Sequence, residues 1–205
     1  NAVFCPLRDN ADTTIDPGPF TIEWLPPNND PATGRGGLEI RNAGGVMTTL
    51  TANDATIKTR SWYNNINGVG ASVDFAHGTS TVIFLAGVDV PTVNDTAPTV
   101  NANETFYNLV IGEGANDASM AIVGTGNLTV NGDFTIGTAN SALSNSIGRT
   151  IVVEGNWSNV GSYTGTGDTV QLGGVDNNAG TVSGTTTFRT LDVNAGDSYT
   201  LSSGA

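Results

Sequence analysis

The residues of this sequence that could do chemistry are few, because it contains one histidine, His77, and one cysteine, Cys5. Metal sites built on several histidines therefore lack the residues they need, and a Ser-His-Asp or Cys-His arrangement would have to use this one histidine. We interpret His77 as a turn residue between Ala76 and Gly78. Cys5 cannot form an internal disulfide, so we interpret it as a buried small apolar residue, with a covalent link to a neighbouring subunit or a lipid as the alternative.

Paired carboxylates are the other catalytic device to consider. Glycosidases and polysaccharide lyases need two or three acids on one face of the molecule. The best candidates are Asp89 and Asp176, which stand at equivalent ends of two similar segments. An acid that recurs with a repeat is more typical of a turn capped by its side chain than of a catalyst. We therefore predict that the chain is not an enzyme and has no catalytic residues.

Calcium is the one cofactor that the composition suggests. Ca²⁺ prefers carboxylate and carbonyl oxygens, and turns rich in Asp and Asn supply both. No segment matches the Gly-Gly-x-Gly-x-Asp nonapeptide or the EF-hand loop. The candidate ligands are acids grouped in two turn-rich segments, Asp9, Asp12 and Asp16 near the start and Glu113 and Asp117 in a later turn.

Asn-x-Ser/Thr sequons occur at four positions, Asn94, Asn103, Asn127 and Asn156. A chain so rich in Asn and Thr produces several such sequons by chance. Asn94 and Asn103 fall in a spacer whose length differs between two similar segments, so we predict that these two are exposed enough to carry a glycan.

Trp62 and Trp157 offer flat aromatic surfaces on which a sugar ring could stack. Each is followed by Asn within two residues, and both occupy the same place in a repeated pattern. This recurrence favours packing in the core or against a turn, with carbohydrate stacking as the alternative.

The composition predicts an all-β fold made of short strands. Thr, Gly, Asn, Val and Ser dominate, Lys occurs once, and no segment concentrates the residues that stable helices prefer. Gly accounts for 27 of 205 residues without a three-residue period, which is typical of many turns.

Charge and hydropathy exclude two classes of partner. Asp and Glu outnumber Lys and Arg by 19 to 7, and the arginines are scattered, so we expect no binding of nucleic acid. No run of 18 apolar residues occurs, so we expect no membrane insertion. A surface made polar by Asn, Thr, Ser and Asp is typical of exported proteins. The start at Asn1, without Met, agrees with a removed signal peptide, and we expect an extracellular or cell-surface location.

The chain divides near residue 37. Six of the eight prolines fall in residues 1–36, which we predict to form an irregular cap or linker with one short strand near Phe20–Leu25. From Gly37 onward, short alternating runs such as Leu38–Arg41 and Thr150–Glu154 end in Gly, Asn or Asp. These runs predict strands of four or five residues with one apolar face.

Internal repetition decides the architecture. Three landmarks recur in the same order at offsets of 95, 87 and 82 residues, so the copies differ by insertions that must be loops. They are Trp62 and Trp157, Gly78–Asp89 and Gly165–Asp176 with six identical positions, and Thr105–Ile111 and Thr187–Val193. We predict a parallel β-helix over residues 37–205, built of coils of 20-odd residues in two imperfect superrepeats of 80–95 residues. Two β-sandwiches in tandem are the alternative.

The repeat texture resembles that of a known group of proteins. Four segments show the resemblance, Thr105–Ile111, Asn127–Ile136, Glu154–Asn159 and Gly165–Gly174. They are similar to the β-solenoid repeats of very large bacterial surface and secreted proteins, including adhesins similar to filamentous haemagglutinin. The resemblance covers residues 37–205 and implies a structural or adhesive role without a catalytic set.

The functional expectation follows from the repeat, the composition and the C-terminal segment. Tyr199–Ala205 shows no polar or irregular cap, so we expect either that the chain continues or that this end stacks on another molecule. We expect an extracellular rod, or a subunit of a filament or surface layer, whose partners are copies of itself or neighbouring repeats. Surface glycans are further candidate partners, and a carbohydrate-binding or carbohydrate-cleaving β-helix is the alternative.

Overall fold

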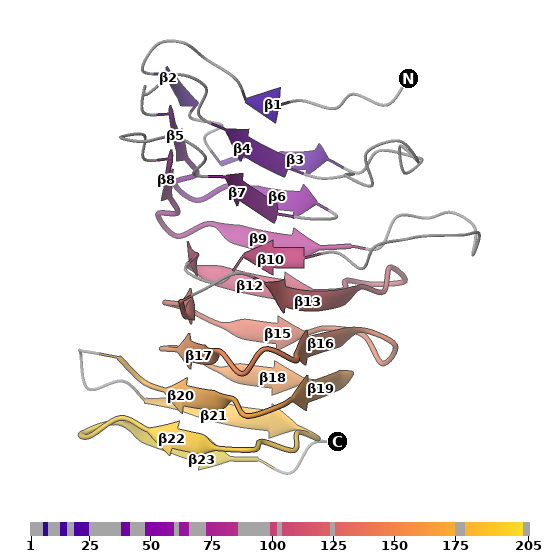
Figure 1. The fold of residues 1–205 in the computed structure, drawn as a ribbon, viewed down its shortest axis with the longest axis vertical. Helices are drawn as coiled ribbons and strands as arrows, with labels where there is room; N and C mark the ends of the chain where they lie inside the picture. The colour runs from indigo at the N-terminus through magenta and orange to yellow at the C-terminus, as the bar shows by residue number, and fades with distance from the viewer. Residues whose placement is uncertain are drawn as a thin grey trace.

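The computed structural model describes residues 6–7, 13–15, 19–24, 38–41, 48–59, 62–65, 73–85, 99–101, 104–123, 126–174 and 179–202. Within these residues the chain forms strands and turns and no helix. The strands follow one another around the three faces of an elongated body (Figure 1). β1, β2 and β3 lie at one end of this body, and β22 and β23 lie at the other.

The first face is one seven-stranded sheet, and the third face is one eight-stranded sheet. The first face consists of β1 (Pro6–Leu7), β4 (Leu38–Arg41), β7 (Trp62–Asn65), β10 (Thr99–Asn101), β13 (Ser119–Val123), β16 (Ala142–Asn145) and β19 (Ser162–Gly165). The third face consists of β3 (Thr21–Trp24), β6 (Thr56–Thr59), β9 (Thr81–Phe84), β12 (Asn108–Ile111), β15 (Phe134–Ile136), β18 (Trp157–Asn159), β21 (Ala179–Gly184) and β23 (Ser198–Leu201).

The second face is divided into two sheets that lie on the same side of the body (Figure 1). The three-stranded sheet consists of β2 (Thr13–Ile15), β5 (Thr48–Thr51) and β8 (Val73–Ala76). The five-stranded sheet consists of β11 (Thr105–Phe106), β14 (Leu128–Val130), β17 (Thr150–Val153), β20 (Thr169–Leu172) and β22 (Leu191–Val193).

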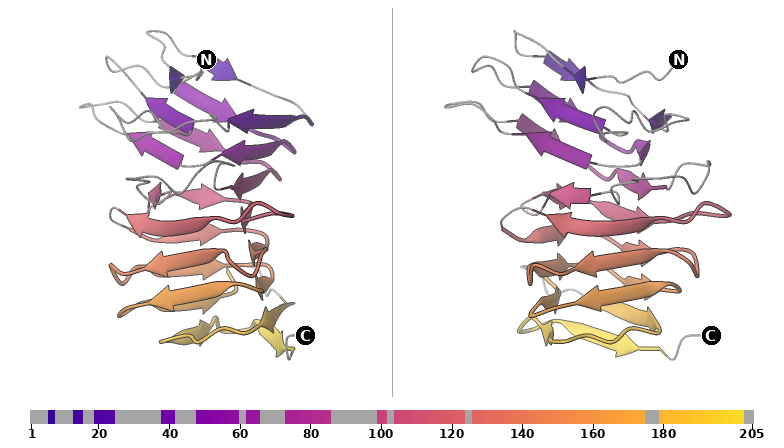
Figure 2. Two further views of the ribbon diagram at one scale, coloured as in Figure 1. Left: turned by 90° about the vertical axis from the view of Figure 1, so that its right-hand side faces the viewer. Right: turned by 45° about the vertical axis from the view of Figure 1, so that its right-hand side comes forward.

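Every pairing between these strands is parallel, and it joins a strand to its equivalent in the next coil. The coils stack along the long axis, as the two views of Figure 2 show. The predicted parallel β-helix is therefore confirmed. Tandem sandwiches, which need antiparallel sheets, are excluded for the described strands.

Most paired strands lie 19 to 27 residues apart, which agrees with the predicted 20-odd residues, but the first coil returns after 33 to 35 residues and Val100 pairs with Trp62, 38 residues before it. At the start of the third-face strands, successive equivalents are 27, 25 and 23 residues apart from Thr81 through Asn108 and Asp133 to Asn156. Because a coil returns to the same face with a variable residue count, the differences must be taken up in the turns at the corners.

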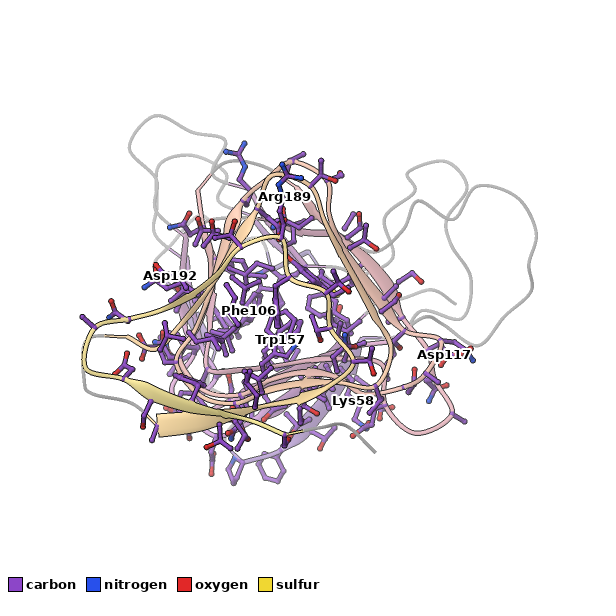
Figure 3. All side chains as sticks on the ribbon, turned by 90° about the horizontal axis from the view of Figure 1, so that it is seen from below. Lys58, Phe106, Asp117, Trp157, Arg189 and Asp192 are labelled. Atoms are coloured by element: carbon purple, nitrogen blue, oxygen red, sulfur yellow. The ribbon has the colours of Figure 1, made fainter. Side chains whose placement is uncertain are left out.

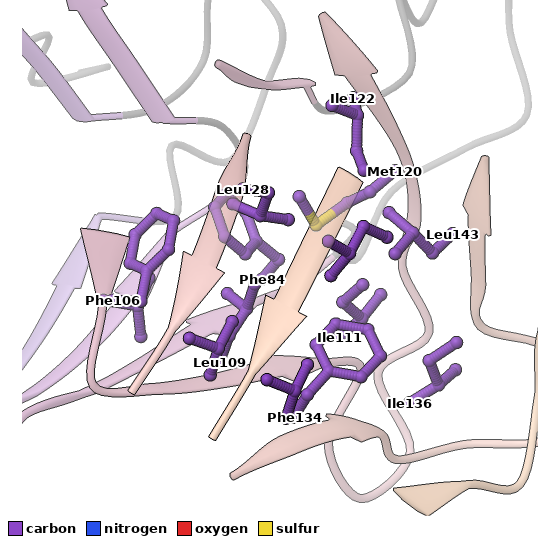
Figure 4. Close-up of a cluster of buried hydrophobic side chains, with 14 of the residues drawn as sticks. Phe84, Phe106, Leu109, Ile111, Met120, Ile122, Leu128, Phe134, Ile136 and Leu143 are labelled. Atoms are coloured by element: carbon purple, nitrogen blue, oxygen red, sulfur yellow. The ribbon is translucent and has the colours of Figure 1, made fainter. Parts of the chain in front are cut away.

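Alternation along each strand builds the core. In β14 and β15 the first and third residues are buried and the middle one is half-buried, as period-two geometry requires. The inward residues stack from coil to coil, for example Leu109, Phe134 and Trp157, all fully buried. Figure 3 shows such side chains filling a three-sided interior, and Figure 4 shows the buried cluster around Leu109 and Phe134. Each fully buried side chain of this size stabilises the fold by roughly 1.5–3 kcal/mol.

The proline-rich start contributes strands to the same stack. The strand predicted near Phe20–Leu25 is present as β3, which pairs with β6. In addition, β1 pairs with β4 and β2 pairs with β5. These described strands of residues 1–36 therefore extend the solenoid.

The repeated landmarks of the sequence lie on different faces. Trp62 belongs to the first face and Trp157 to the third, while Thr81–Phe84 belongs to the third face and Thr169–Leu172 to the second. The second copy is thus displaced by one face, because the offset between the copies is not a whole number of coils. The boundaries of the superrepeats stay a prediction.

Candidate functional site

The last coil exposes side chains at positions that are buried in the coils before it. Leu191 and Val193 of β22 pair in register with Val170 and Leu172, and Leu201 of β23 pairs with Val182. Val170 and Leu172 are fully buried and Val182 is 6% exposed, whereas Leu191, Val193 and Leu201 are 37%, 42% and 70% exposed. These three residues, here called the open end, form an apolar surface across the end of the core.

The edges of the same strands are also unpaired within the described part of the chain. β22 and β23 stand last in their sheets, with β20 and β21 on their inner sides. An unpaired strand edge presents backbone N–H and C=O groups that can accept a further strand. The open end therefore combines apolar side chains with free ladder groups.

A polar ladder runs along the corner where the third face begins. The side-chain Oδ1 of Asn108 accepts the backbone N–H of Asp133 at 2.9 Å, and Oδ1 of Asp133 accepts the backbone N–H of Asn156 at 2.8 Å. Oδ1 of Asn156 in turn accepts the N–H and the hydroxyl of Thr181, at 2.9 and 2.8 Å. Each rung ties one coil to the next with side-chain oxygens.

The other two sequons differ in their hydrogen bonds. Nδ2 of the exposed Asn156 donates to Asp133 at 2.9 Å while its oxygen accepts from Thr181. Asn127 is also exposed and lies just before β14. The two sequons that we predicted to carry glycans, at Asn94 and Asn103, lie outside the described residues.

The turn proposed as a calcium site has protein partners for both of its acids. Glu113 accepts a hydrogen bond from Lys58 Nζ at 2.6 Å, and this bond raises the pKa of Lys58. Asp117 accepts from the hydroxyl of Thr138 at 2.6 Å and from Nδ2 of Asn140 at 3.1 Å. A calcium ion would have to compete with these donors. The other candidate ligands, Asp9, Asp12 and Asp16, lie outside the described residues.

Among the described residues, no three His, Cys, Asp or Glu side chains gather closely enough to hold a metal ion. The described chain also forms no helix long and apolar enough to cross a membrane. Cys5, Asp89 and Asp176 lie outside the described residues.

Both tryptophans that could have stacked on a sugar are fully buried. Trp62 packs edge-on against Phe75 and Phe106, with ring centroids 4.6 and 5.2 Å away. Trp157 lies 4.4 Å from the ring of Phe134. The core interpretation of both residues is confirmed, and they are not accessible to carbohydrate.

Two buried acids were not singled out from the sequence. Glu104, 7% exposed, accepts a hydrogen bond from the Trp62 indole at 2.9 Å, and Asp168, 2% exposed, accepts one from the Tyr163 hydroxyl. Both stand two residues before an inward apolar residue, Phe106 and Val170, at the corner where the chain enters the second face. Their place in the alternating pattern is the signal that could have identified them.

The pair of Tyr163 and Asp168 has an electrostatic consequence. Burial, followed by the hydrogen bond to Asp168, raises the pKa of the Tyr163 hydroxyl well above its ordinary value. Gly165 makes room for this pair, since a Cβ there would collide with the Asp168 carboxylate. Oδ1 of Asp168 is buried without a hydrogen-bond partner in the described structure.

His77 follows β8 and opens the turn to β9, where Ser80 N–H donates to its carbonyl at 3.0 Å, as the sequence predicted. Its ring stacks against Tyr107 with centroids 6.4 Å apart. Its Nε2 lies 3.4 Å from Nδ2 of Asn131. This environment is that of a packed turn residue.

In comparisons with family models, with curated proteins and with solved structures, the chain has no match.

Proposed function

We propose that this chain is an extracellular structural or adhesive protein, a rod or a subunit of a filament or surface layer, in which further coils stack on the open end. The observation that supports this proposal most directly is the exposure of Leu191, Val193 and Leu201 at inward positions of the last coil. A coil placed on them would continue both the core columns and the parallel ladders.

The geometry favours linear growth over a closed pair. Every pairing between the described strands is parallel and the coils follow one another in one direction along the rod, so the two ends of the stack are different surfaces. Joining one kind of end to the other is a heterologous contact, which produces an open filament when the rotation does not close. Burial of apolar surface supplies the driving force, and the edges of β22 and β23 that no other described strand covers supply directional hydrogen bonds.

The sequence adds support for the location and the role. An Asn-, Thr- and Ser-rich composition with a net charge of −12 suits an exported protein that must remain soluble outside the cell. The resemblance to bacterial adhesin repeats is one of texture, and the β-solenoid agrees with it. The role we infer is therefore to display turns and loops along a stiff axis.

Sedimentation velocity over a concentration series, followed by electron microscopy, tests this proposal. We expect the wild-type chain to form end-to-end assemblies and Leu201→Lys to abolish them, because a charge would be buried in the joint. Val160→Lys is the matched control, since Val160 is 57% exposed at a corner of the rod and not at its end. Persistent monomers of the wild-type chain, or equal effects of the two variants, would contradict the proposal.

A carbohydrate-binding or carbohydrate-cleaving β-helix is the alternative that the sequence left open, and release of reducing ends from polysaccharides measures the cleavage. Our proposal expects no release above background. Binding of carbohydrate without cleavage is compatible with an adhesive rod.

A further inference from the structure

Two arginines stand out on the corner between the first and second faces. Thr150 pairs with Thr169, and Val170 pairs with Leu191, so Thr169 is followed in the stack by Thr190. One residue earlier in each coil, Arg149, Asp168 and Arg189 therefore form one column. The two arginines are two coils apart, which corresponds to about 9–10 Å along the rod at the usual strand spacing.

Asp168 stands between the arginines but does not pair with them. Its side chain is 2% exposed and turns inward to the Tyr163 hydroxyl. Arg189 is exposed and lies at the corner in Figure 3. Within the described part of the chain, the one ion pair of a lysine or arginine is that of Lys58 with Glu113. Arg149 and Arg189 thus have no carboxylate partner there.

Arg149 is held in place by its own turn. Its backbone N–H donates to Oδ1 of the buried Asn145 at 3.0 Å, and its carbonyl accepts Nδ2 of the same residue at 2.6 Å. The Nε of Arg149 is buried and lacks an acceptor. Because this nitrogen is buried, the half-buried Arg149 would meet a ligand through the other nitrogens of its guanidinium group.

Hydroxyl groups line the side of this corner. Thr150 and Thr169 are half-buried and Thr190 is exposed, one in each of three successive coils. A regular row of hydroxyls beside two spaced cations suits an extended ligand that itself repeats and carries both hydroxyl and anionic groups. An acidic polysaccharide has this chemistry, whereas a folded protein partner would present an irregular surface.

We propose that this arginine corner, formed by Arg149 and Arg189 with Thr150, Thr169 and Thr190, binds an acidic polysaccharide whose carboxylate or sulfate groups contact the two guanidinium groups. Arginine is well suited to such groups because its planar fork donates two parallel hydrogen bonds. At 0.15 M salt the screening length is about 8 Å, so of the acids on the rod those beyond this distance oppose the contact only weakly, whereas Asp168, one coil from each arginine, opposes it more. The site deepens the adhesive part of the proposed function but does not require end-to-end assembly.

Isothermal titration at 0.15 M salt, with dextran sulfate, neutral dextran of equal length and oligogalacturonate as probes, tests the proposal. We expect binding of at least one anionic probe and none of neutral dextran. Sulfate and carboxylate as the natural anion are distinguished by which probe binds. Arg149→Gln combined with Arg189→Gln is expected to weaken binding by about tenfold or more, as the loss of two charge-assisted hydrogen bonds implies.

Lys58→Gln is the control for loss of one positive charge elsewhere, on the third face, and it should leave the affinity within about twofold. All variants are compared in the Leu201→Lys background, so that failure of end-to-end assembly and failure of this site are separate results. No binding of either anionic probe, an unchanged affinity of the double variant, or an equal loss in Lys58→Gln would overturn the proposal. So would a double variant, made separately with Leu201 retained, that alters only self-association, because this result would identify the corner as a contact between copies.

Discussion

Trp157 and Leu201 stand two coils apart in the same inward column, linked through Val182, yet one is fully buried and the other is 70% exposed. Both side chains point to the interior of the rod. The difference is that Trp157 has coils on both sides, whereas Leu201 has a described coil on one side only. Burial in this fold is therefore supplied by neighbouring coils, and a residue's own coil does not suffice.

The comparison explains why the inward residues of the last described coil are the exposed ones. In a stacked fold, stability is approximately the sum of terms within each coil and terms between neighbours. A middle coil has two neighbour terms, and the last described coil has one. The same side chain thus contributes more to stability in a middle coil than in the last described coil. A further coil stacked on the last one would remove this difference.

The largest expected effect is a loss of stability in the coils that have a neighbouring coil on both sides. Trp157→Ala removes a fully buried ring that packs on Phe134, Tyr163 and Phe188, and it should lower the free energy of unfolding by about 3–5 kcal/mol. Leu201→Ala, in the last described coil, should cost less than about 1 kcal/mol at a protein concentration at which the chain is monomeric. Urea unfolding measures both. Similar losses in the two variants would show that the last coil is covered in solution.

The sequence predicted which residues face the core better than it predicted the corners between the faces. Alternating apolar residues in short runs such as Thr150–Glu154 predicted the inward positions. Successive side chains of a strand point to opposite faces, so every second residue must face the core. The same reasoning placed Trp62 and Trp157 in the core. The parallel stacking followed from many similar short strands, which a β-helix accommodates by repetition.

The sequence could not predict which strands share a face. Identity between Gly78–Asp89 and Gly165–Asp176 reflects strand and turn chemistry, which is alike on all three faces, so the alignment relates β9 to β20 across faces. The arginine corner was missed for the same reason. Arg149 and Arg189 are 40 residues apart in the sequence, and only the coil lengths bring them into one column.

A second, smaller effect is the dependence of stability on pH, which compares a tyrosine in a middle coil with one in the last described coil. Burial raises the pKa of Tyr163 in a closed coil, and burial followed by the charge of Asp197 raises the pKa of Tyr199 in the last coil. A folded pKa above the unfolded value of about 10 means that stability is present below pH ~10 and is lost as pH rises further. The raised pKa of Lys58 acts in the same direction.

We therefore expect the melting temperature to stay level from about pH 7 to 9 and to fall above about pH 10. Tyr163→Phe should flatten this fall more than Tyr199→Phe, because the ring of Tyr163 is the more deeply buried of the two. The slope with pH is the readout, since Tyr163→Phe also leaves Asp168 without its donor at every pH. A steeper or unchanged slope in Tyr163→Phe would contradict the claim that the raised pKa of Tyr163 causes the loss of stability at high pH.

The smallest expected effect concerns the polar ladder that joins the closed coils to the coil beside the open end. Asn156→Ala removes the acceptor of the Thr181 N–H and hydroxyl and the donor to Asp133, and it should cost about 1 kcal/mol because these groups are exposed and water replaces them. Asn127→Ala is the matched control and should change stability by less than about 0.5 kcal/mol.

Hydrogen exchange locates this effect within the rod. The Thr181 amide loses its acceptor in Asn156→Ala, so exchange should accelerate in β21 and in β23, which depends on β21 for pairing, while β12 and β15 keep their protection. Acceleration spread evenly over all coils would mean that the described rod opens as one unit. Confined acceleration means that the last two described coils open together as a separate unit.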